Sequence, residues 1–201
     1  MVKNKIEIIN IKKNQKINKK IVNSLNIVLT DISSNNIDQN FNFSVTENSV
    51  LNIHCLLVNS NKQKSHIFTI NQQKNSTVNI YVKAFGFNQS NTKVIIDSKI
   101  PKNAENIVLN QEINGYIFDD GSTIIATPSM LVDNNKIVAN HSVSVGSINP
   151  EKLFYLMSKG IDTKTAKTVL IRSEYDYYKN FDDKKCKLIY KEVDKKIMEL
   201  F

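Results

Sequence analysis

Apolar and polar residues alternate along roughly the first 140 positions, a period of two that is typical of β-strands. The alternating segments are short, recur roughly every ten to fifteen residues, and are joined by links rich in Asn, Ser, Gln and Lys. Periodicity alone fits a β-sandwich and a β-solenoid equally well, because both consist of many short strands. The predicted strands are 5–11, 25–29, 41–45, 50–57, 77–82, 92–96, 106–109, 116–118, 123–126 and 130–132.

The hydrophobic period changes near residue 149 from two to about 3.6, which predicts helices. Asn149 suits a helix cap, Pro150 suits the first helical position, and Glu151 complements the positive end of the helix dipole. Gly160 is placed to end this helix in a left-handed conformation.

Two more helices follow, the second capped by Asp162 or Thr163 and the third running from about Asp183 to the end. We therefore predict a mainly β protein with a core over residues 1–148 and a C-terminal helical segment over residues 149–201. The third helix has apolar residues spaced by four, namely Ile189, Val193, Ile197 and Phe201.

Composition narrows the class of protein. The net charge of +8 suggests nucleic-acid binding, but Trp is absent and the one Arg is Arg172, whereas Arg forks and stacked aromatic rings usually carry that recognition. Cys55 and Cys186 lie too far apart for a disulfide framework or a Cys-x-x-Cys site. No stretch approaches the ~18 apolar residues that span a bilayer. We expect a cytoplasmic protein that binds neither nucleic acid nor a membrane, and interpret the abundant Asn, Lys and Ile as codon bias.

The most informative motif extends from Pro128 to Gly160. A Pro leads into a short apolar strand, a second apolar strand ends in His141, and a Gly follows five residues later. A helix built around Phe-Tyr-Leu then ends in a basic residue and a Gly. This order and spacing, over about forty residues, resembles the signature that closes the SufB/SufD family of iron–sulfur cluster assembly proteins. The matching residues are Pro128, Leu131, Val132, Val138, Ala139, His141, Gly146, Ile148, Leu153, Phe154, Tyr155, Leu156, Ser158, Gly160 and Ala166.

The resemblance implies a right-handed parallel β-helix, that is a stacked β-solenoid, whose exposed edges need a partner. SufB-type chains carry a reactive Cys before the Pro and a carboxylate after the His, where this chain has Ser122 and Ser142. A hydroxyl is a poor ligand for iron and sulfane sulfur. The chain therefore resembles a shortened SufD-type, non-enzymatic subunit that pairs with a SufB-type scaffold protein.

Two groups of site residues follow from the resemblance. His141 matches a His near the SufB/SufD interface that is implicated in cluster formation, and neutral imidazole can bind iron. The iron–sulfur cluster would be transient, at the complex interface and not bound by this chain alone. An ordinary exposed His at a strand end is the alternative.

In the family, the C-terminal helical segment docks the ATPase SufC, which supplies the nucleotide chemistry. Phe154, Tyr155 and Leu156 are consecutive and cannot all face one core, so we expect them, with Lys159 and Gly160, to contact a SufC-type ATPase. Packing of these helices against the end of the β core is the alternative.

The other polar residues are weaker candidates. His54 and Cys55 must face opposite sides of one strand, so they cannot bind the same ion. His66 follows a Lys- and Gln-rich link and is expected to be solvated, and Asp119 and Asp120 are expected in a turn.

Two alternative functions remain open from the sequence. One is a stand-alone structural or adhesive β-solenoid without a metal role. The other is a homodimer that replaces both SufB and SufD, against which the missing sulfur-accepting Cys argues.

Overall fold

β-strands occupy the chain up to Gly146, and helices follow from Pro150. The computed structural model describes residues 5–133, 135–176, 178 and 184–200. Its strands are β1 (Lys5–Asn10), β2 (Lys16–Ile21), β3 (Ser24–Asp31), β4 (Ile37–Val45), β5 (Val50–Ser60), β6 (Gln63–Gln72), β7 (Thr77–Phe87), β8 (Asn91–Ile100), β9 (Ile107–Ile117), β10 (Thr123–Val132) and β11 (Ile137–Gly146). Its helices are α1 (Pro150–Ser158), α2 (Thr163–Tyr175) and α3 (Lys184–Met198).

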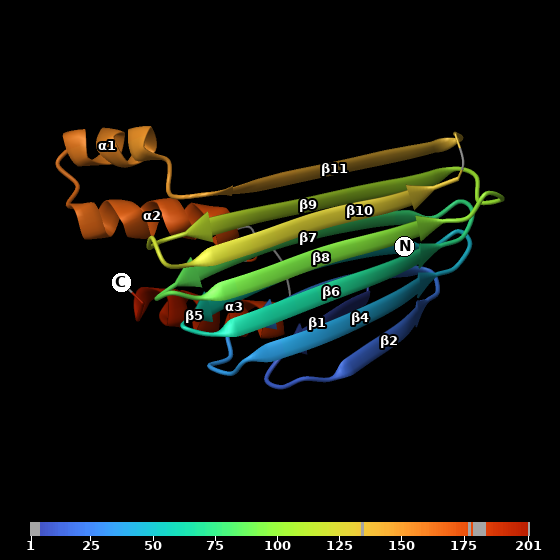
Figure 1. The fold of residues 1–201 in the computed structure, drawn as a ribbon, viewed down its shortest axis with the longest axis horizontal. Helices are drawn as coiled ribbons and strands as arrows, with labels where there is room; N and C mark the ends of the chain where they lie inside the picture. The colour runs from blue at the N-terminus through green and yellow to red at the C-terminus, as the bar shows by residue number, and fades with distance from the viewer. Residues whose placement is uncertain (1–4, 134, 177, 179–183, 201) are drawn as a thin grey trace.

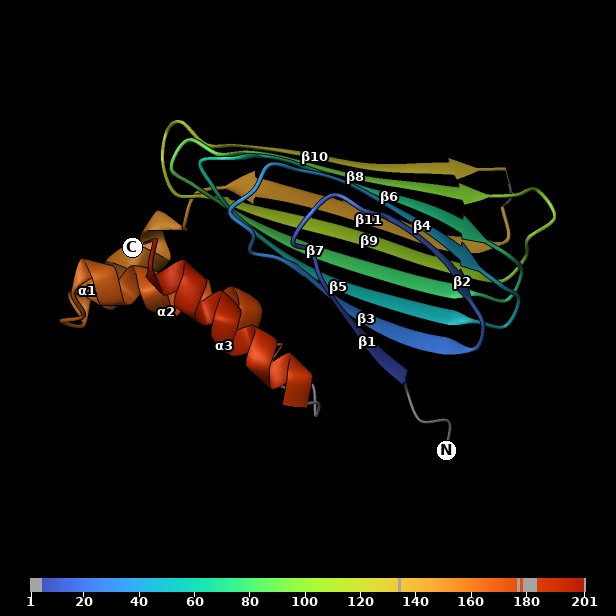
Figure 2. The same cartoon turned by 90° about the horizontal axis from the view of Figure 1, so that it is seen from below.

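Successive strands alternate between two sheets that lie face to face (Figures 1 and 2). The six-stranded sheet has the order β1-β3-β5-β7-β9-β11, and the five-stranded sheet has the order β10-β8-β6-β4-β2. All neighbouring strands are parallel. The chain thus forms a stacked β-solenoid whose rungs each contain one strand from each sheet, which confirms the predicted fold class.

The interior is filled by alternate residues of every strand, as a period of two requires. In the six-stranded sheet, Leu29, Cys55 and Val82 are in register and are fully buried. In the five-stranded sheet, the rings of Phe41 and Phe68 stack with centroids 4.7 Å apart. The two sheets therefore share one hydrophobic core between them.

Asparagine side chains stack between rungs, so some of the asparagines have a structural role. At one corner of the solenoid Asn48, Asn75 and Asn106 adopt left-handed backbone conformations, with φ near 55°. Asparagine tolerates this conformation better than most residues. The Nδ2 of Asn75 donates to Asn48 Oδ1 at 3.1 Å, and the Nδ2 of Asn106 donates to Asn75 Oδ1 at 3.0 Å.

The rungs differ in length, which explains why no strict sequence repeat is visible. Residues that stack on neighbouring rungs of the six-stranded sheet are separated by 26, 27, 31 and 30 positions in the chain. A fixed-period search therefore misses the stacking.

The helices cover part of the outer face of the six-stranded sheet (Figure 2). Outward-facing residues of β3, β5 and β7 form a hydrophobic cluster with α2 and α3, so these helices pack on the side of the solenoid and not on its last rung. The predicted starting residue Asp183 and the terminal Phe201 lie outside the described residues. The buried members of this cluster are Val28, Leu56, Val58, Phe85, Phe87, Ile171, Tyr175, Tyr178, Cys186, Ile189, Val193 and Ile197.

Within the described part of the chain, no helix is long and apolar enough to cross a membrane. The division into separate domains at residue 148 stays a prediction.

Candidate functional site

β10 and β11 form the last rung of the solenoid. Each is the outermost strand of its sheet and, among the described residues, pairs with a strand on one side only. Pro128 lies within β10, a position compatible with an edge strand because proline has no N–H to donate. An edge of this kind presents unpaired backbone N–H and C=O groups to any strand that approaches.

The two ends of the solenoid differ in charge. At the first end, β2 has the sequence KINKKI, with Lys16, Lys19 and Lys20 among its six residues. At the last end, β10 (TIIATPSMLV) and β11 (IVANHSVSVG) contain no Asp, Glu, Lys or Arg. Lysine on an edge strand discourages pairing, whereas an uncharged edge permits it.

Large aliphatic side chains are exposed on the last rung. On β11, Val138 is 57% exposed, and Val143 and Val145 are 44% and 40% exposed. On β10, Ile125 and Leu131 are also exposed. Exposed aliphatic residues gathered on an unpaired edge are typical of a surface that another protein covers.

His141 lies in the middle of β11, in register with Gln111 of β9, which is in register with Ile80 of β7. Gln111 and Ile80 face the interior and are buried, so His141 continues an interior row. Its side chain is exposed because no further rung covers it in the described structure.

A small polar group lies behind His141. The Nε2 of Gln111 donates to Ser98 Oγ at 2.7 Å and to the carbonyl of Ser129 at 3.4 Å. Gln111 Oε1 is buried and accepts no hydrogen bond within the described structure. Gln111 therefore places a buried amide in register with His141, and the sequence did not predict it.

No group of three or more His, Cys, Asp and Glu side chains among the described residues could hold a metal ion. The residue in register with His141 on the neighbouring strand is Gln111, whose side chain is an amide.

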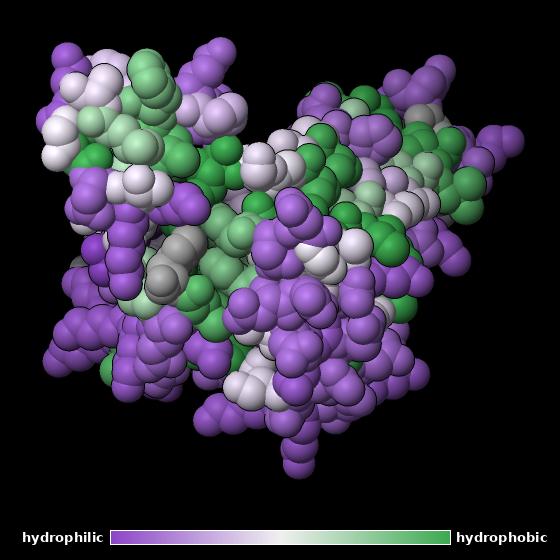
Figure 3. Space-filling view, turned by 60° about the vertical axis from the view of Figure 1, so that its left-hand side comes forward, coloured by the Kyte–Doolittle hydropathy of each residue, from purple (hydrophilic) through white to green (hydrophobic). Residues whose placement is uncertain are grey.

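α1 exposes the aromatic residues that the sequence singled out. Phe154 is 72% and Tyr155 60% exposed, whereas Leu156 is half-buried, and α1 has no fully buried residue. The Nζ of Lys159 lies 5.4 Å from the centre of the Tyr155 ring. Gly160 ends the helix with φ +84°, as predicted. In Figure 3, hydrophobic side chains are visible at the surface of the lobe that carries α1.

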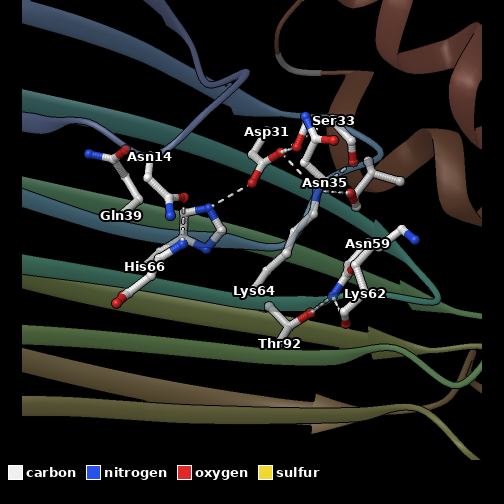
Figure 4. A network of polar contacts seen from close by, with 12 residues as sticks. Asn14, Asp31, Ser33, Asn35, Gln39, Asn59, Lys62, Lys64, His66 and Thr92 are labelled. Atoms are coloured by element: carbon white, nitrogen blue, oxygen red, sulfur yellow. Dashed lines mark hydrogen bonds and ion pairs between the residues drawn. The ribbon is translucent and has the colours of Figure 1, made fainter.

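A buried ionic network lies between the two sheets (Figure 4). The Nζ of Lys64 donates to Asp31 Oδ1 at 2.8 Å and to the carbonyls of Ser33 and Val58. His66 Nε2 lies 2.9 Å from Asp31 Oδ2, and Ser33 donates to Asp31 Oδ1 through both its N–H and its hydroxyl. The side chains of Asp31, Lys64 and His66 are all fully buried.

The expectation that His66 is solvated was wrong. His66 is in phase with Phe68 and Ile70 on β6, and the period of two places all three inside. The polar link before His66 suggested exposure, but the phase of the following strand decides which way the side chain points. The alternation of His66 with Phe68 and Ile70 was the sequence signal that could have predicted its burial.

The buried network shifts the pKa values of Asp31 and of the nearby Cys55. Burial alone would raise the pKa of Asp31, but the hydrogen bond from His66 and the charge of Lys64 outweigh it and hold the pKa below its usual value. Burial, together with the charge of Asp31, raises the pKa of Cys55 well above its usual value. The Cys55 thiol therefore stays protonated and is a poor nucleophile or sulfur acceptor.

A second polar group joins the sheet to α2. Glu174 of α2 pairs with Lys83 Nζ at 3.1 Å and accepts a 2.5 Å hydrogen bond from the Tyr116 hydroxyl. Burial lowers the pKa of His54 to about 4, so His54 is neutral near pH 7. A hollow of about 410 Å³ lies here, lined by His54, Tyr81, Lys83, Glu112, Glu174 and Tyr178.

Comparison with known proteins gives consistent matches. Residues 9–174 match the family described as "SUF system FeS cluster assembly, SufBD core domain". The iron–sulfur cluster assembly protein SufD of Bacillus subtilis (strain 168) is 33% identical over 73 residues, which are 36% of this chain and 17% of that protein. The iron–sulfur cluster assembly protein SufD of Plasmodium berghei (strain Anka) is 28% identical over 76 residues, 37% of this chain and 6% of that protein.

The matches thus span less than a fifth of the length of either relative. The family match, by contrast, covers most of this chain, from β1 through β11 and into α2. It includes the last rung, His141, α1 and most of α2. The chain belongs to the SufBD core-domain family of the SUF iron–sulfur cluster assembly system.

Proposed function

We propose that this chain is a SufD-like, non-catalytic subunit in iron–sulfur cluster assembly, which pairs with a SufB-type scaffold protein through β10 and β11. The observation that carries the proposal is the contrast between the two ends of the solenoid. The first end carries lysines on its edge strand, and the last end is uncharged and aliphatic. The uncharged last end is better suited to strand addition than the lysine-bearing edge of β2.

In this proposal His141 contributes an imidazole ligand to a cluster that is assembled between the two proteins. The cluster is the cargo of the complex. His141 belongs to no group of three or more potential metal ligands in the described part of the chain, and we assign the remaining ligands, as thiolates, to the SufB-type partner.

A SufC-type ATPase docks on α1 in the same proposal. Phe154 and Tyr155 supply two large exposed anchors on one short helix, and Lys159 lies beside them. Exposed aromatic residues of this kind often dominate the binding energy of protein interfaces. Because α1 has no fully buried residue, these side chains are free to contact a partner without unpacking the core.

The test of the proposal is co-purification of this chain with a SufB-type and a SufC-type protein. A lysine placed on the last edge, Val138→Lys, is expected to abolish association with the SufB-type protein. Val22→Lys is the matched control, because Val22 is 60% exposed at the other end and Val138 is 57% exposed. Equal binding by both variants, or a wild-type chain that forms only homodimers, would contradict the proposal.

A further inference from the structure

A ladder of asparagine side chains runs across the outer face of the six-stranded sheet. Each member lies in register with the next, and each Nδ2 donates to the Oδ1 of the asparagine on the preceding rung. The four hydrogen bonds measure 2.8, 2.8, 2.8 and 3.0 Å. The asparagine ladder consists of Asn26, Asn52, Asn79, Asn110 and Asn140.

The ladder position differs from the other outward positions of the same strands. Two residues further along, the same five strands carry Val, His, Tyr, Glu and Ser, with no residue type in common. The variation shows that the outer face does not require one residue type for stacking in general. A repeated amide at one position reflects the hydrogen bond that it makes to the next rung.

The two ends of the ladder are not equivalent. On the side of the first rung, Asn26 is in register with Ile6 of β1, which has no side-chain hydrogen-bonding group. On the side of the last rung, Asn140 donates to Asn110, and its own Oδ1 accepts no hydrogen bond from the described residues. In the four completed steps, the equivalent Oδ1 accepts from the following rung. The ladder is therefore closed at its first end and open at its last end.

We propose that the strand that a SufB-type partner adds to β11 carries a side-chain amide, Asn or Gln, opposite Asn140. The ladder then continues across the interface into the partner. This inference rests on the proposed function, because it specifies the strand that covers the last rung. Asn140 acts as the acceptor, the partner's amide acts as the donor, and the pair fixes the register in which the two edges meet.

The expected effect of the contact is moderate and specific. A side-chain hydrogen bond of this kind contributes roughly a 5- to 10-fold change in association. Val143 and Val145 add apolar contacts but do little to fix the register of the two strands. Aliphatic side chains of similar shape would pack almost as well if the partner strand were shifted. Asn140 is thus the residue of β11 that selects the partner strand.

The test compares the affinity of the wild-type chain, Asn140→Val and Asn26→Val for a SufB-type protein, measured by calorimetry. Both substitutions remove one hydrogen bond of the ladder, and only Asn140→Val removes the acceptor at the open end. Asn140→Val is expected to weaken association by about 10-fold, and Asn26→Val by less than about twofold. Asn140→Gln, which keeps the amide, is expected to retain most of the affinity.

The outcomes separate the inference from the proposed function. A wild-type chain that does not bind the SufB-type protein refutes the proposed function itself. Wild-type binding that Asn140→Val leaves unchanged overturns the inference alone. Equal weakening by Asn140→Val and Asn26→Val also overturns the inference, because the effect then comes from the ladder and not from the interface. If Asn140→Gln binds as weakly as Asn140→Val, side-chain shape and not the amide determines the affinity, and the inference is overturned as well. Thermal unfolding of the variants checks that each one is folded.

Discussion

The buried ionic network makes a strong prediction about stability. Asp31→Asn removes a carboxylate that accepts four hydrogen bonds and leaves the ammonium of Lys64 fully buried without a counter-charge. Removal of one partner from a buried ion pair costs about 3–5 kcal/mol, because the remaining charge is uncompensated. We expect Asp31→Asn to lower the free energy of unfolding by an amount in this range.

The double variant shows whether the charge is the cause. Asp31→Asn combined with Lys64→Met removes both charges and keeps the volumes similar, so no unpaired ion is left in the core. Its cost should fall below the sum of the two single costs by about 2 kcal/mol or more. The assay is denaturant unfolding followed by circular dichroism of the β signal, with midpoint and slope compared across the four proteins.

The pH dependence follows from the direction of the Asp31 shift. The pKa of Asp31 in the folded protein lies below its usual value of 3.8, so its stabilising contribution is fully present above about pH 4. That contribution is lost as the pH falls through the folded-state pKa. The difference between wild type and Asp31→Asn should therefore stay constant from about pH 5 to 7 and shrink below about pH 4. A cost under about 1 kcal/mol, or single-variant costs that add up to the cost of the double variant, would show that an unpaired buried charge is not the cause.

Two further predictions concern the proposed sites. Phe154→Ala combined with Tyr155→Ala should weaken binding of a SufC-type ATPase without changing the circular dichroism of the β core, because both side chains are exposed. Loss of the β signal together with binding would show that these residues stabilise the fold. His141→Ala should lower iron retention after anaerobic reconstitution of the complex, while it changes the stability of this chain by less than ~0.5 kcal/mol, as expected for an exposed residue. Unaltered iron content and absorbance would remove His141 from the cluster site.

Sequence patterns located the strands whose inner and outer residues differ in polarity. Alternation placed β5 and β7 correctly, whereas β2 was missed because its lysines mask the pattern. β6 was missed because Lys64 and His66, both polar, face the interior. β9 and β10 were each predicted as two pieces, since polar residues and Pro128 interrupt their apolar pattern.

The candidate site was only partly accessible from sequence. The motif around His141 pointed to the last rung, and the consecutive Phe154 and Tyr155 pointed to an exposed helix face. The asparagine ladder was not visible, because unequal rung lengths hide the spacing of its members. The partnership of Asp31 with Lys64 and His66 also required the structure, since these residues lie on different sheets.

Amide hydrogen exchange would show directly whether a SufB-type protein covers the last rung. Exchange would be measured by mass spectrometry on the intact chain, alone and in complex with the SufB-type protein. Peptides from β10 and β11 should gain protection on binding, because their free edges become paired, while peptides from β1 and β2 should not. A stable complex in which β11 exchanges as fast as in the free chain would show that the SufB-type protein does not cover the last rung.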